Sequence, residues 1–235
     1  MNALHYFIEL RTRLLRCLIC LVAVFALLSY KANTLYTWLS FPLLHRLPSG
    51  HLIATQVIAP FFAPFKLAFL VAVLACVPVF LYQTWQFISP ALYGRERRWL
   101  WPFFVLSLVL FYAGVAFAYF LIFPLLFQFL AHAAPAGVVL MPDMNDYLNF
   151  TTQLLLVFGV LFEIPMAMVL LVGLNVITRA RLVAWRSYAI VGAFIVGMLV
   201  APPDVLSQTL LALPMWGLYE LGLWLTRWVP DAKKK

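Results

Sequence analysis

The chain has 235 residues, of which 66% are hydrophobic and only 10% are charged, and its mean hydropathy is +0.99. Soluble domains typically carry about 25% charged residues, so this composition excludes a soluble protein and indicates one that crosses a membrane several times. The net charge of +8 does not indicate a nucleic-acid partner, because the basic residues stand singly or in triplets beside apolar runs, as membrane topology signals do. At about 20 apolar residues per span there is room for roughly five to seven spans, and we predict a single transmembrane domain over residues 1–235.

The first thirteen residues predict a short amphipathic helix at the membrane surface, because their polar and their apolar side chains would lie on different faces of a helix. The apolar stretch 14–30 predicts the first span. Lys31-Ala-Asn-Thr34 follows it in place of a small-x-small cleavage site, so we expect this span to be retained and not removed as a secretory signal. Three cysteines fall within apolar helices and are interpreted as core residues: Cys17, Cys20 and Cys76.

Residues 31–64 form a long apolar connection that we interpret as a structured outer cap. The second span, about 65–80, leads into residues 82–99, YQTWQFISPALYGRERRW, which are both aromatic and basic. Aromatic side chains gather at headgroup level, so this stretch predicts a hairpin at a membrane face. The remaining spans are predicted at about 102–127, 148–174, 188–201 and 205–226.

Lysine and arginine are distributed unevenly between the two ends of these spans. The N-terminus, the hairpin, the connection 175–187 and the C-terminus together hold thirteen, whereas the alternate connections hold three. By the positive-inside rule this predicts six spans with both termini in the cytoplasm. The chain shows no internal duplication, a usual signature of secondary transporters.

The fifth predicted span is short, with 14 residues between 188 and 201. Such a helix reaches about 21 Å, less than a hydrocarbon core of roughly 30 Å. Either the bilayer thins around it or the helix does not cross completely. A thinned bilayer favours a protein that helps a large object across the membrane.

Glu163 lies near the middle of the fourth span, in FGVLFEIPMAMVLL. An ionisable group there costs about 2.5–3.5 kcal/mol on insertion scales, and such residues mark functional sites. Pro165 adds a free backbone carbonyl beside it. The alternative is a protonated glutamate satisfied by a neighbouring helix. Gln208 in the sixth span carries a weaker signal, because glutamines in spans often only hydrogen-bond helices together.

Glu9 and Glu96 lie at the predicted cytoplasmic surface, where charge costs little. Glu9 matches Arg13 at i, i+4, and Glu96 has arginines on both sides, so local charge pairing explains both. The other interpretation is recognition of arginine, because a guanidinium matches a carboxylate in a bidentate fork that lysine cannot make. Phe87 and Tyr93 fit either an interfacial aromatic belt or a ligand site.

The sequence lacks the residue patterns that are typical of an enzyme active site. The four histidines, at positions 5, 45, 51 and 132, fall at or outside the membrane interfaces, so they predict neither a metal cluster nor a Ser-His pair. No glycine-rich phosphate loop is present. We therefore expect a protein that is not an enzyme and has no cofactor.

The chain resembles the TatC family, the core subunit of the twin-arginine protein translocase. The matching stretches cover nearly the whole chain in order: FIELRTRLL (7–15), APFFAPFKLAF (59–69), YQTWQFISPALYGRERR (82–98), FYAGVAFAYFLIFPL (111–125), FGVLFEIPMAM (158–168) and VGAFIVGMLVAPPDVLSQTLLALPM (191–215). The resemblance implies an all-α integral membrane protein of six helices in a cupped bundle, with short fifth and sixth helices joined by a Pro-Pro turn. It also implies the bacterial inner membrane as location.

The resemblance implies a receptor for twin-arginine signal peptides of folded cargo proteins, driven by the proton-motive force. Its implied partners are the single-span proteins TatA and TatB, membrane lipid and further copies of the chain. The residues implied to bind signal peptide are Glu96, Phe87, Glu9 and Arg11. Glu163 and Gln208 match intramembrane polar and partner-binding positions, and Pro42 and Asp204 match the outer cap and turn. Ala201 stands where several relatives have threonine, which removes one hydroxyl from the implied docking site.

A proton-coupled carrier of small solutes is the alternative from another functional class. In that case Glu163 would titrate during transport. The missing internal repeats and the short fifth span favour the translocase subunit over the carrier.

Overall fold

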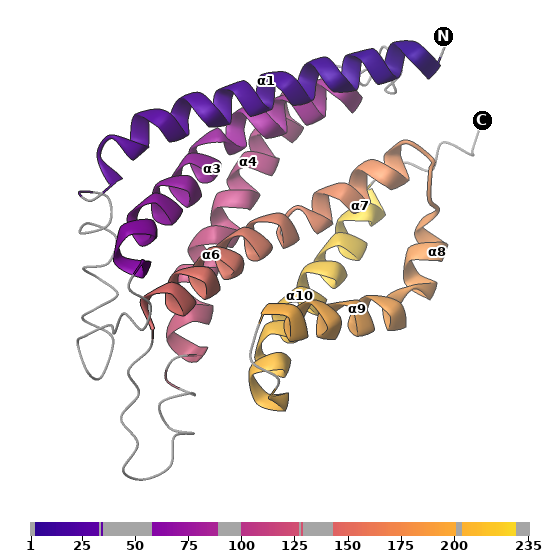
Figure 1. Ribbon diagram of the computed structural model, residues 1–235. Coiled ribbons are helices and arrows are strands. Elements are labelled where there is room, and N and C mark those ends of the chain that lie inside the picture. Colours follow the sequence, from indigo (N-terminus) through magenta and orange to yellow (C-terminus); the bar gives the residue numbers. More distant parts are fainter. Residues whose placement is uncertain are drawn as a thin grey trace. The chain divides into compact units, whose positions relative to one another are not determined.

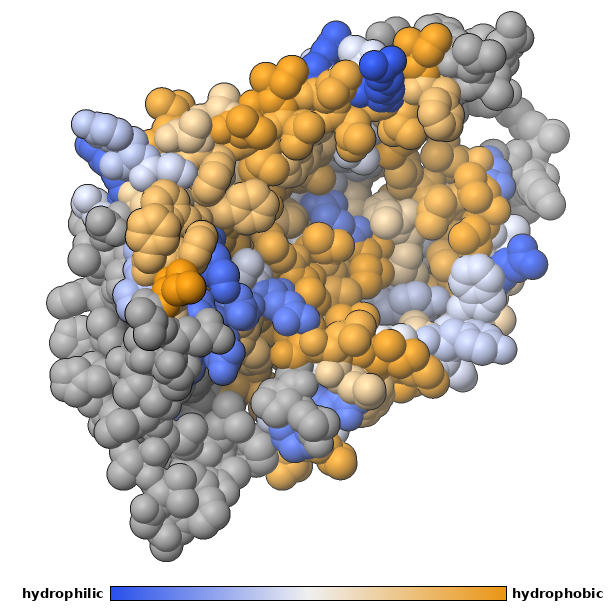
Figure 2. All heavy atoms as spheres, in the orientation of Figure 1, coloured by the Kyte–Doolittle hydropathy of each residue, from blue (hydrophilic) through white to orange (hydrophobic). Residues whose placement is uncertain are grey.

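The structure, a computed structural model, describes residues 3–32, 34, 58–88, 100–126, 128, 143–200 and 204–228. The secondary-structure elements in these ranges are helices, which confirms the predicted all-α fold (Figure 1). Four helical stretches are long and apolar enough to cross a membrane: Phe7–Ser29, Ala59–Ile88, Trp101–Leu126 and Met144–Gly173. Hydrophobic residues cover much of the α1 surface seen in Figure 2, as expected for a helix that faces lipid.

The chain forms two compact units. The first consists of residues 1–104 and 134–152, and the second of residues 105–133 and 153–235. Two long helices cross the boundary, so each contributes to both units: α4 (Leu100–Phe117) and α6 (Met144–Leu161).

The first unit is built on helix α1, which runs without interruption from Ala3 to Ser29. The sequence suggested a surface helix over 1–13 followed by a separate span from 14, and this division is wrong. Neither proline nor glycine occurs between residues 3 and 29, so nothing in the sequence ends the helix near Arg13. The amphipathic start and the apolar span therefore form one rod.

Helix α3 (Ala59–Ile88) packs antiparallel along α1 (Figure 1). Three residue pairs define the register of the two helices. As the residue number rises along α1, the number of its partner on α3 falls. Arg13 Nη1 is 3.2 Å from Gln83 Oε1, the Cys20 and Cys76 Sγ atoms are 3.7 Å apart, and the Phe25 and Phe69 ring centroids are 5.7 Å apart. Helix α3 is longer than the predicted span 65–80, because its last turns continue as polar helix beyond the apolar run.

Lys66 ties the first turns of α6 to α3. Its Nζ donates to Asn145 Oδ1 and to Asn149 Oδ1, both at 3.2 Å. The opposite end of α3 contacts the start of α4, where the rings of Trp85 and Phe103 stack with centroids 5.7 Å apart. The first unit is thus fastened at both ends of α3.

The second unit contains the remainder of α4 and α6 and a series of shorter helices. These are η3 (Ala118–Ile122), α7 (Ile164–Gly173), α8 (Arg179–Ala184), α9 (Arg186–Val200), α10 (Val205–Leu225) and η4 (Thr226–Trp228). With 15 residues, α9 confirms the short fifth helix, and α10 has 21. Together with the four long stretches they account for the six expected membrane segments.

The predicted fourth span is divided into α6 and α7 by a turn at Phe162 and Glu163. Pro165 causes this break, because it has no N–H to donate to the carbonyl of Leu161 and its ring crowds that turn. The chain resumes at once, with Ala167 N donating to Glu163 O at 2.8 Å. Glu163 therefore lies at a discontinuity of the helix and not within a regular turn.

Helices α4 and α6 approach each other closely at two glycines. A Cβ atom added at Gly114 would lie 2.5 Å from Phe158 O, and one added at Gly159 would lie 2.7 Å from the Phe111 ring. Small residues allow such close packing of membrane helices, where dispersion and not the hydrophobic effect holds helices together.

Candidate functional site at the ends of α1 and α3

Arg13 joins the N-terminal part of α1 to the last turns of α3. Its Nε and Nη2 donate to Glu9 Oε1 at 3.0 and 2.5 Å. Its Nη1 donates to the side-chain and backbone oxygens of Gln83 at 3.2 and 3.4 Å, and its Nη2 also reaches Gln86 O at 3.4 Å. The carbonyl end of a helix carries partial negative charge, so the guanidinium is well placed there.

Glu9 pairs with Arg13, which confirms the i, i+4 ion pair expected from the sequence. The pair uses one carboxylate oxygen. Among the described residues, Glu9 Oε2 accepts no hydrogen bond, and the side chain is 26% exposed. A carboxylate offers about four lone-pair sites, so Glu9 retains the capacity to bind a second cationic donor.

The antiparallel register brings Glu9 and Phe87 to the same level. Arg13 lies opposite Gln83; Glu9 is one turn before Arg13, and Phe87 is one turn after Gln83. Two residues assigned to one site from the resemblance therefore share one end of the α1–α3 pair. Arg11 is exposed on α1, and it makes no hydrogen bond or ion pair within the described part of the chain.

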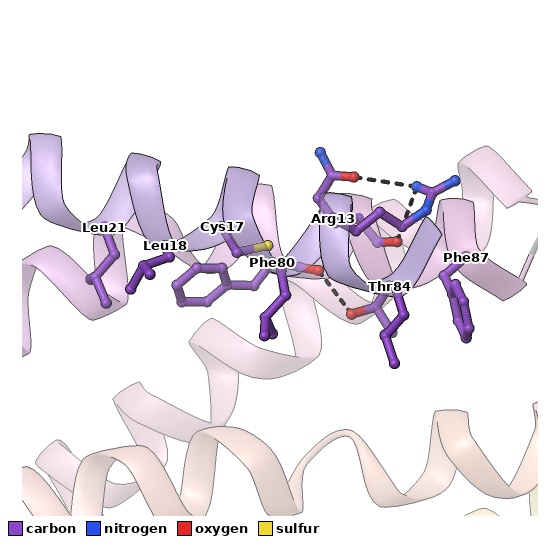
Figure 3. Close-up of a pocket in the computed structure, with 10 residues that line it drawn as sticks. Arg13, Cys17, Leu18, Leu21, Phe80, Thr84 and Phe87 are labelled. Atoms are coloured by element: carbon purple, nitrogen blue, oxygen red, sulfur yellow. Dashed lines mark hydrogen bonds between the residues drawn. The ribbon is translucent and has the colours of Figure 1, made fainter. Parts of the chain in front are cut away.

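A groove of about 610 Å³ runs between α1 and α3 from this end (Figure 3). Its α1 wall is a helical stripe of Leu10, Leu14, Leu18 and Leu21. Its α3 wall consists of Phe80, Gln83, Thr84 and Phe87, and Arg13 of α1 also lines it opposite Gln83. We call this feature the α1–α3 groove. It is apolar along most of its length and polar where Arg13, Gln83 and Thr84 line it.

Glu96 and Pro42, two further predicted site residues, lie outside the described residues. Glu96 follows the end of α3 by eight residues in the sequence. The assignments of both residues stay predictions.

Glu163 is half-buried in the second unit. Ser107, itself 1% exposed, is the side chain that hydrogen-bonds to this carboxyl group, and Glu163 Oε1 has no partner among the described residues. A buried carboxyl that is incompletely satisfied, at a break in a membrane helix, is a costly arrangement. Both interpretations drawn from the sequence, a functional group and a satisfied one, stay open at this position.

Gln208 of α10 uses its side-chain amide inside the protein, because Nε2 donates to Phe194 O on α9 at 2.8 Å. Gln153 of α6 does the same to Leu199 O at 2.7 Å. The two glutamines therefore bond the short helix α9 to α10 and to α6. This is the helix-to-helix bonding that the sequence suggested for Gln208.

Asp204 begins helix α10 as its N-cap, and its Oδ2 accepts from Ser207 N at 2.7 Å. We expect Asp204→Ala to lower the free energy of unfolding by about 1 kcal/mol. Asp204→Asn should preserve stability, because the amide oxygen can also accept this bond. Thermal unfolding of the purified protein in detergent measures both; equal losses would show that Asp204 acts through its charge and not through the cap.

Arg13, Gln83 and Gln86 are the site residues that sequence reasoning did not assign to a binding function. Arg13 was visible as the partner of Glu9, but its bonds to α3 depend on the register between two helices seventy residues apart. No local pattern in the sequence encodes that register.

Comparison with known proteins gives consistent matches. The family described as Sec-independent protein translocase protein (TatC) matches residues 5–214. TatC of Escherichia coli (strain K12) is 51% identical over 223 residues, 94% of this chain and 86% of the relative. TatC of Haemophilus influenzae is 49% identical, covering 94% and 87%. A crystal structure titled "Twin Arginine Translocase Receptor- TatC" superposes with a TM-score of 0.85 at 35% identity and covers 94% of this chain and 98% of that one.

Proposed function

Because the chain belongs to the TatC family of Sec-independent protein translocases, we propose that it binds twin-arginine signal peptides at the end of α1 and α3 that carries Glu9. It is a multi-pass protein of the bacterial inner membrane and a transport component, not an enzyme. Membership in this family supports the translocase hypothesis over the alternative of a small-solute carrier. The observation that carries the proposal is the half-used carboxylate of Glu9, which is paired with Arg13 at the ends of α1 and α3.

Chemistry supports arginine as the ligand. Arg13 already neutralises part of the Glu9 charge, so a second guanidinium would bind in a shared arrangement in which the carboxylate bridges two cations. Phe87 lies at the same level, and a guanidinium stacks on aromatic faces. In our proposal Glu96, which follows α3 in the sequence, supplies the second acid for a pair of arginines, and Arg11 borders the site.

The remaining parts of the proposal concern orientation and partners. The excess of basic residues at the N-terminus, after α3, between α7 and α9 and at the C-terminus supports cytoplasmic termini. Helices α9 and α10 present large exposed apolar side chains, including Val191, Ile195, Met198 and Leu213, which suit docking of the single membrane helices of TatA and TatB. We further propose that the protein works in several copies with proton-motive-force-driven export, and that Glu163 and Gln208 serve this assembly.

The proposal predicts that Glu96→Gln weakens binding of a twin-arginine peptide by roughly 10- to 100-fold, the value of a hydrogen bond to a charged group. Glu163→Gln should change this affinity little, because Glu163 lies in a membrane segment and outside the proposed arginine site. Fluorescence anisotropy with a labelled peptide and nanodisc-embedded protein measures both constants. Equal losses in the two variants would contradict this division of roles.

A direct test of the site uses photoreactive probes at Phe87 and Glu96. We expect crosslinks to a twin-arginine peptide that disappear when its arginine pair is changed to lysines, because lysine cannot make the bidentate contact. Crosslinks that persist with lysine would mean that the acids serve only to balance local charge.

A further inference from the structure

Lys66 lies near the start of α3, and two asparagines of α6 hold its ammonium group in place. Its Nζ donates to Asn145 Oδ1 and to Asn149 Oδ1, both at 3.2 Å. Both partners are neutral, and the ion pairs of the described residues do not include Lys66. The described part of the chain therefore leaves this positive charge without a counter-charge. We propose that the cluster of Lys66, Asn145 and Asn149 binds the phosphodiester group of a membrane phospholipid.

The lysine determines how the two asparagine amides are turned. An ammonium group has three donors and no acceptor, so the oxygen of each amide, and not its nitrogen, faces Nζ. Two of the three ammonium donors are used in this way, and the third bonds to no described residue. The Nδ2 group of Asn149 likewise makes no hydrogen bond within the described chain. The cluster therefore offers N–H donors together with a positive charge, the combination that binds a phosphate oxygen.

The surroundings of Lys66 on α3 are apolar, which indicates a lipid as the ligand. Phe62 and Phe69 lie four residues before and three residues after it, so the three side chains share one face of the helix. The two phenylalanines are 51% and 46% exposed, and Lys66 and Asn149 are exposed as well. A phospholipid carries a phosphate joined to apolar chains and so contacts both parts of this surface. An inorganic anion contacts the polar cluster alone.

The fixed position of the ammonium group distinguishes Lys66 from an ordinary lysine at a helix end. Such lysines commonly extend to the headgroup region without a specific partner. A flexible lysine loses rotamer freedom when it binds a ligand, and this loss opposes binding. Asn145 and Asn149 are i, i+4 on α6, so both amides hold Lys66 from one face of that helix. A phosphate therefore meets a donor group that the protein has already ordered.

Two acids beside the start of α6 limit the charge that the cluster can accept. Asp143 Oδ1 accepts from the backbone N of Asn145 at 2.7 Å and from that of Asp146 at 3.4 Å, so this carboxylate caps the helix. Asp146 is exposed, and its negative charge repels additional negative charge at the cluster. A phosphodiester, with a single negative charge, therefore fits better than a phosphate monoester, which carries nearly two.

Asn149→Asp separates lipid binding from the structural bond between α3 and α6. A carboxylate oxygen accepts from Nζ as the amide oxygen does, so this variant keeps the two helices fastened. It also neutralises Lys66 and removes the Nδ2 donor. We expect the unfolding midpoint without added lipid to be unchanged or higher, and phospholipid binding to fall about tenfold. Unchanged lipid binding would overturn the inference, because the asparagines would then only join two helices.

Binding is measured with a photoactivatable phosphatidylglycerol whose reactive group lies next to the phosphate, added to the purified protein in an uncharged detergent. We expect it to label residues 61–69 and 145–149, and Lys66→Gln should reduce this labelling about tenfold. Lys31→Gln is the matched control. Lys31 is exposed at the same end of the α1–α3 pair, and its side chain makes no hydrogen bond or ion pair among the described residues. Equal effects of the two substitutions would assign the labelling to charge alone and overturn the inference.

Two further probes separate the phospholipid from its parts. A photoactivatable diacylglycerol has the same chains without the phosphate, and we expect it to label this face weakly and independently of Lys66. Inorganic phosphate should not compete with phosphatidylglycerol, because it lacks the chains that contact Phe62 and Phe69. Equal labelling by diacylglycerol would mean that the face binds acyl chains alone, and competition by inorganic phosphate would mean a site for free anions. Either result would overturn the inference.

The lipid site is separate from the proposed peptide site. Lys66 lies near the start of α3, whereas Gln83 and Phe87 lie in its last turns. Lys66→Gln should therefore leave the affinity for a twin-arginine peptide unchanged while the lipid labelling falls. Fluorescence anisotropy with the labelled peptide provides this measurement. Loss of peptide binding together with lipid labelling would show that the substitution disturbs the whole first unit, and it would overturn the inference of a local lipid site.

Discussion

Arg13→Leu is expected to lower the free energy of unfolding by about 3 kcal/mol, because it removes one partner of a largely buried ion pair. The Arg13 side chain is 14% exposed and bonds to Glu9, Gln83 and Gln86. Its loss leaves the Glu9 carboxylate facing the carbonyl end of α3 without a cation. The same variant should lose twin-arginine peptide binding, since Glu9 and Phe87 are then no longer held at one level.

Thermal unfolding and peptide anisotropy test this expectation together. Arg16→Leu is the matched control, because Arg16 is exposed on the same helix and, within the described residues, makes no hydrogen bond; it should change neither quantity. Arg13→Lys should fall between the two, since lysine keeps the charge but cannot bond in several directions within one plane. Equal behaviour of Arg13→Leu and Arg16→Leu would show that the contacts of Arg13 contribute nothing to stability.

Gly114→Ala is expected to destabilise the protein by about 3 kcal/mol, at the upper end for overpacking. The new Cβ would meet Phe158 O at 2.5 Å and Phe162 Cγ at 2.8 Å. The first of these is a backbone atom that cannot rotate away, so α4 and α6 must separate. Because Phe162 belongs to the turn that also contains Glu163, we expect export activity to fall as well.

Gly217→Ala and Gly192→Ala are the controls for this substitution. Nothing lies within 4 Å of a Cβ at either position, so alanine should be neutral or stabilise by up to about 1 kcal/mol through its higher helix propensity. Unfolding midpoints of the three variants give the comparison directly. Destabilisation in all three would indicate a general intolerance of these helices to alanine and not a close contact at Gly114.

Hydropathy predicts the membrane segments of this fold well, because each apolar run is long by itself and needs no information from its neighbours. The short helix α9 was visible for the same reason. The helix boundaries were less accurate: α1 absorbs the expected surface helix, and α3 continues to Ile88. Composition marks where the bilayer ends, whereas a helix ends where its backbone is interrupted.

Backbone interruptions have local causes that the sequence only partly reveals. Pro165 explains the break between α6 and α7. Pro124 similarly cannot donate to the carbonyl of Phe120, and the chain responds with the π-helix η3, in which Phe123 N bonds to Ala118 O. The proline is evident in the sequence, but the choice of a wider turn over a kink depends on packing around it.

The candidate site shows the same division between local and long-range information. The Glu9–Arg13 pair follows from helical spacing alone. The meeting of Glu9 with Phe87, and the bonds of Arg13 to the last turns of α3, follow from a register fixed by contacts as far apart as Cys20 with Cys76. The register between α1 and α3 cannot be predicted from the sequence pattern of either helix.

The same register has a mechanical consequence. The 27 residues of α1 extend about 40 Å, and its contacts with α3 at Arg13, Cys20 and Phe25 are spread over about 18 Å of this length. Sliding by one turn would shift every pair by about 5.4 Å and break all of them at once. The two helices therefore resist shear and bend as one beam, so a force applied at the Arg13 end is transmitted to the Phe25 end with little slack.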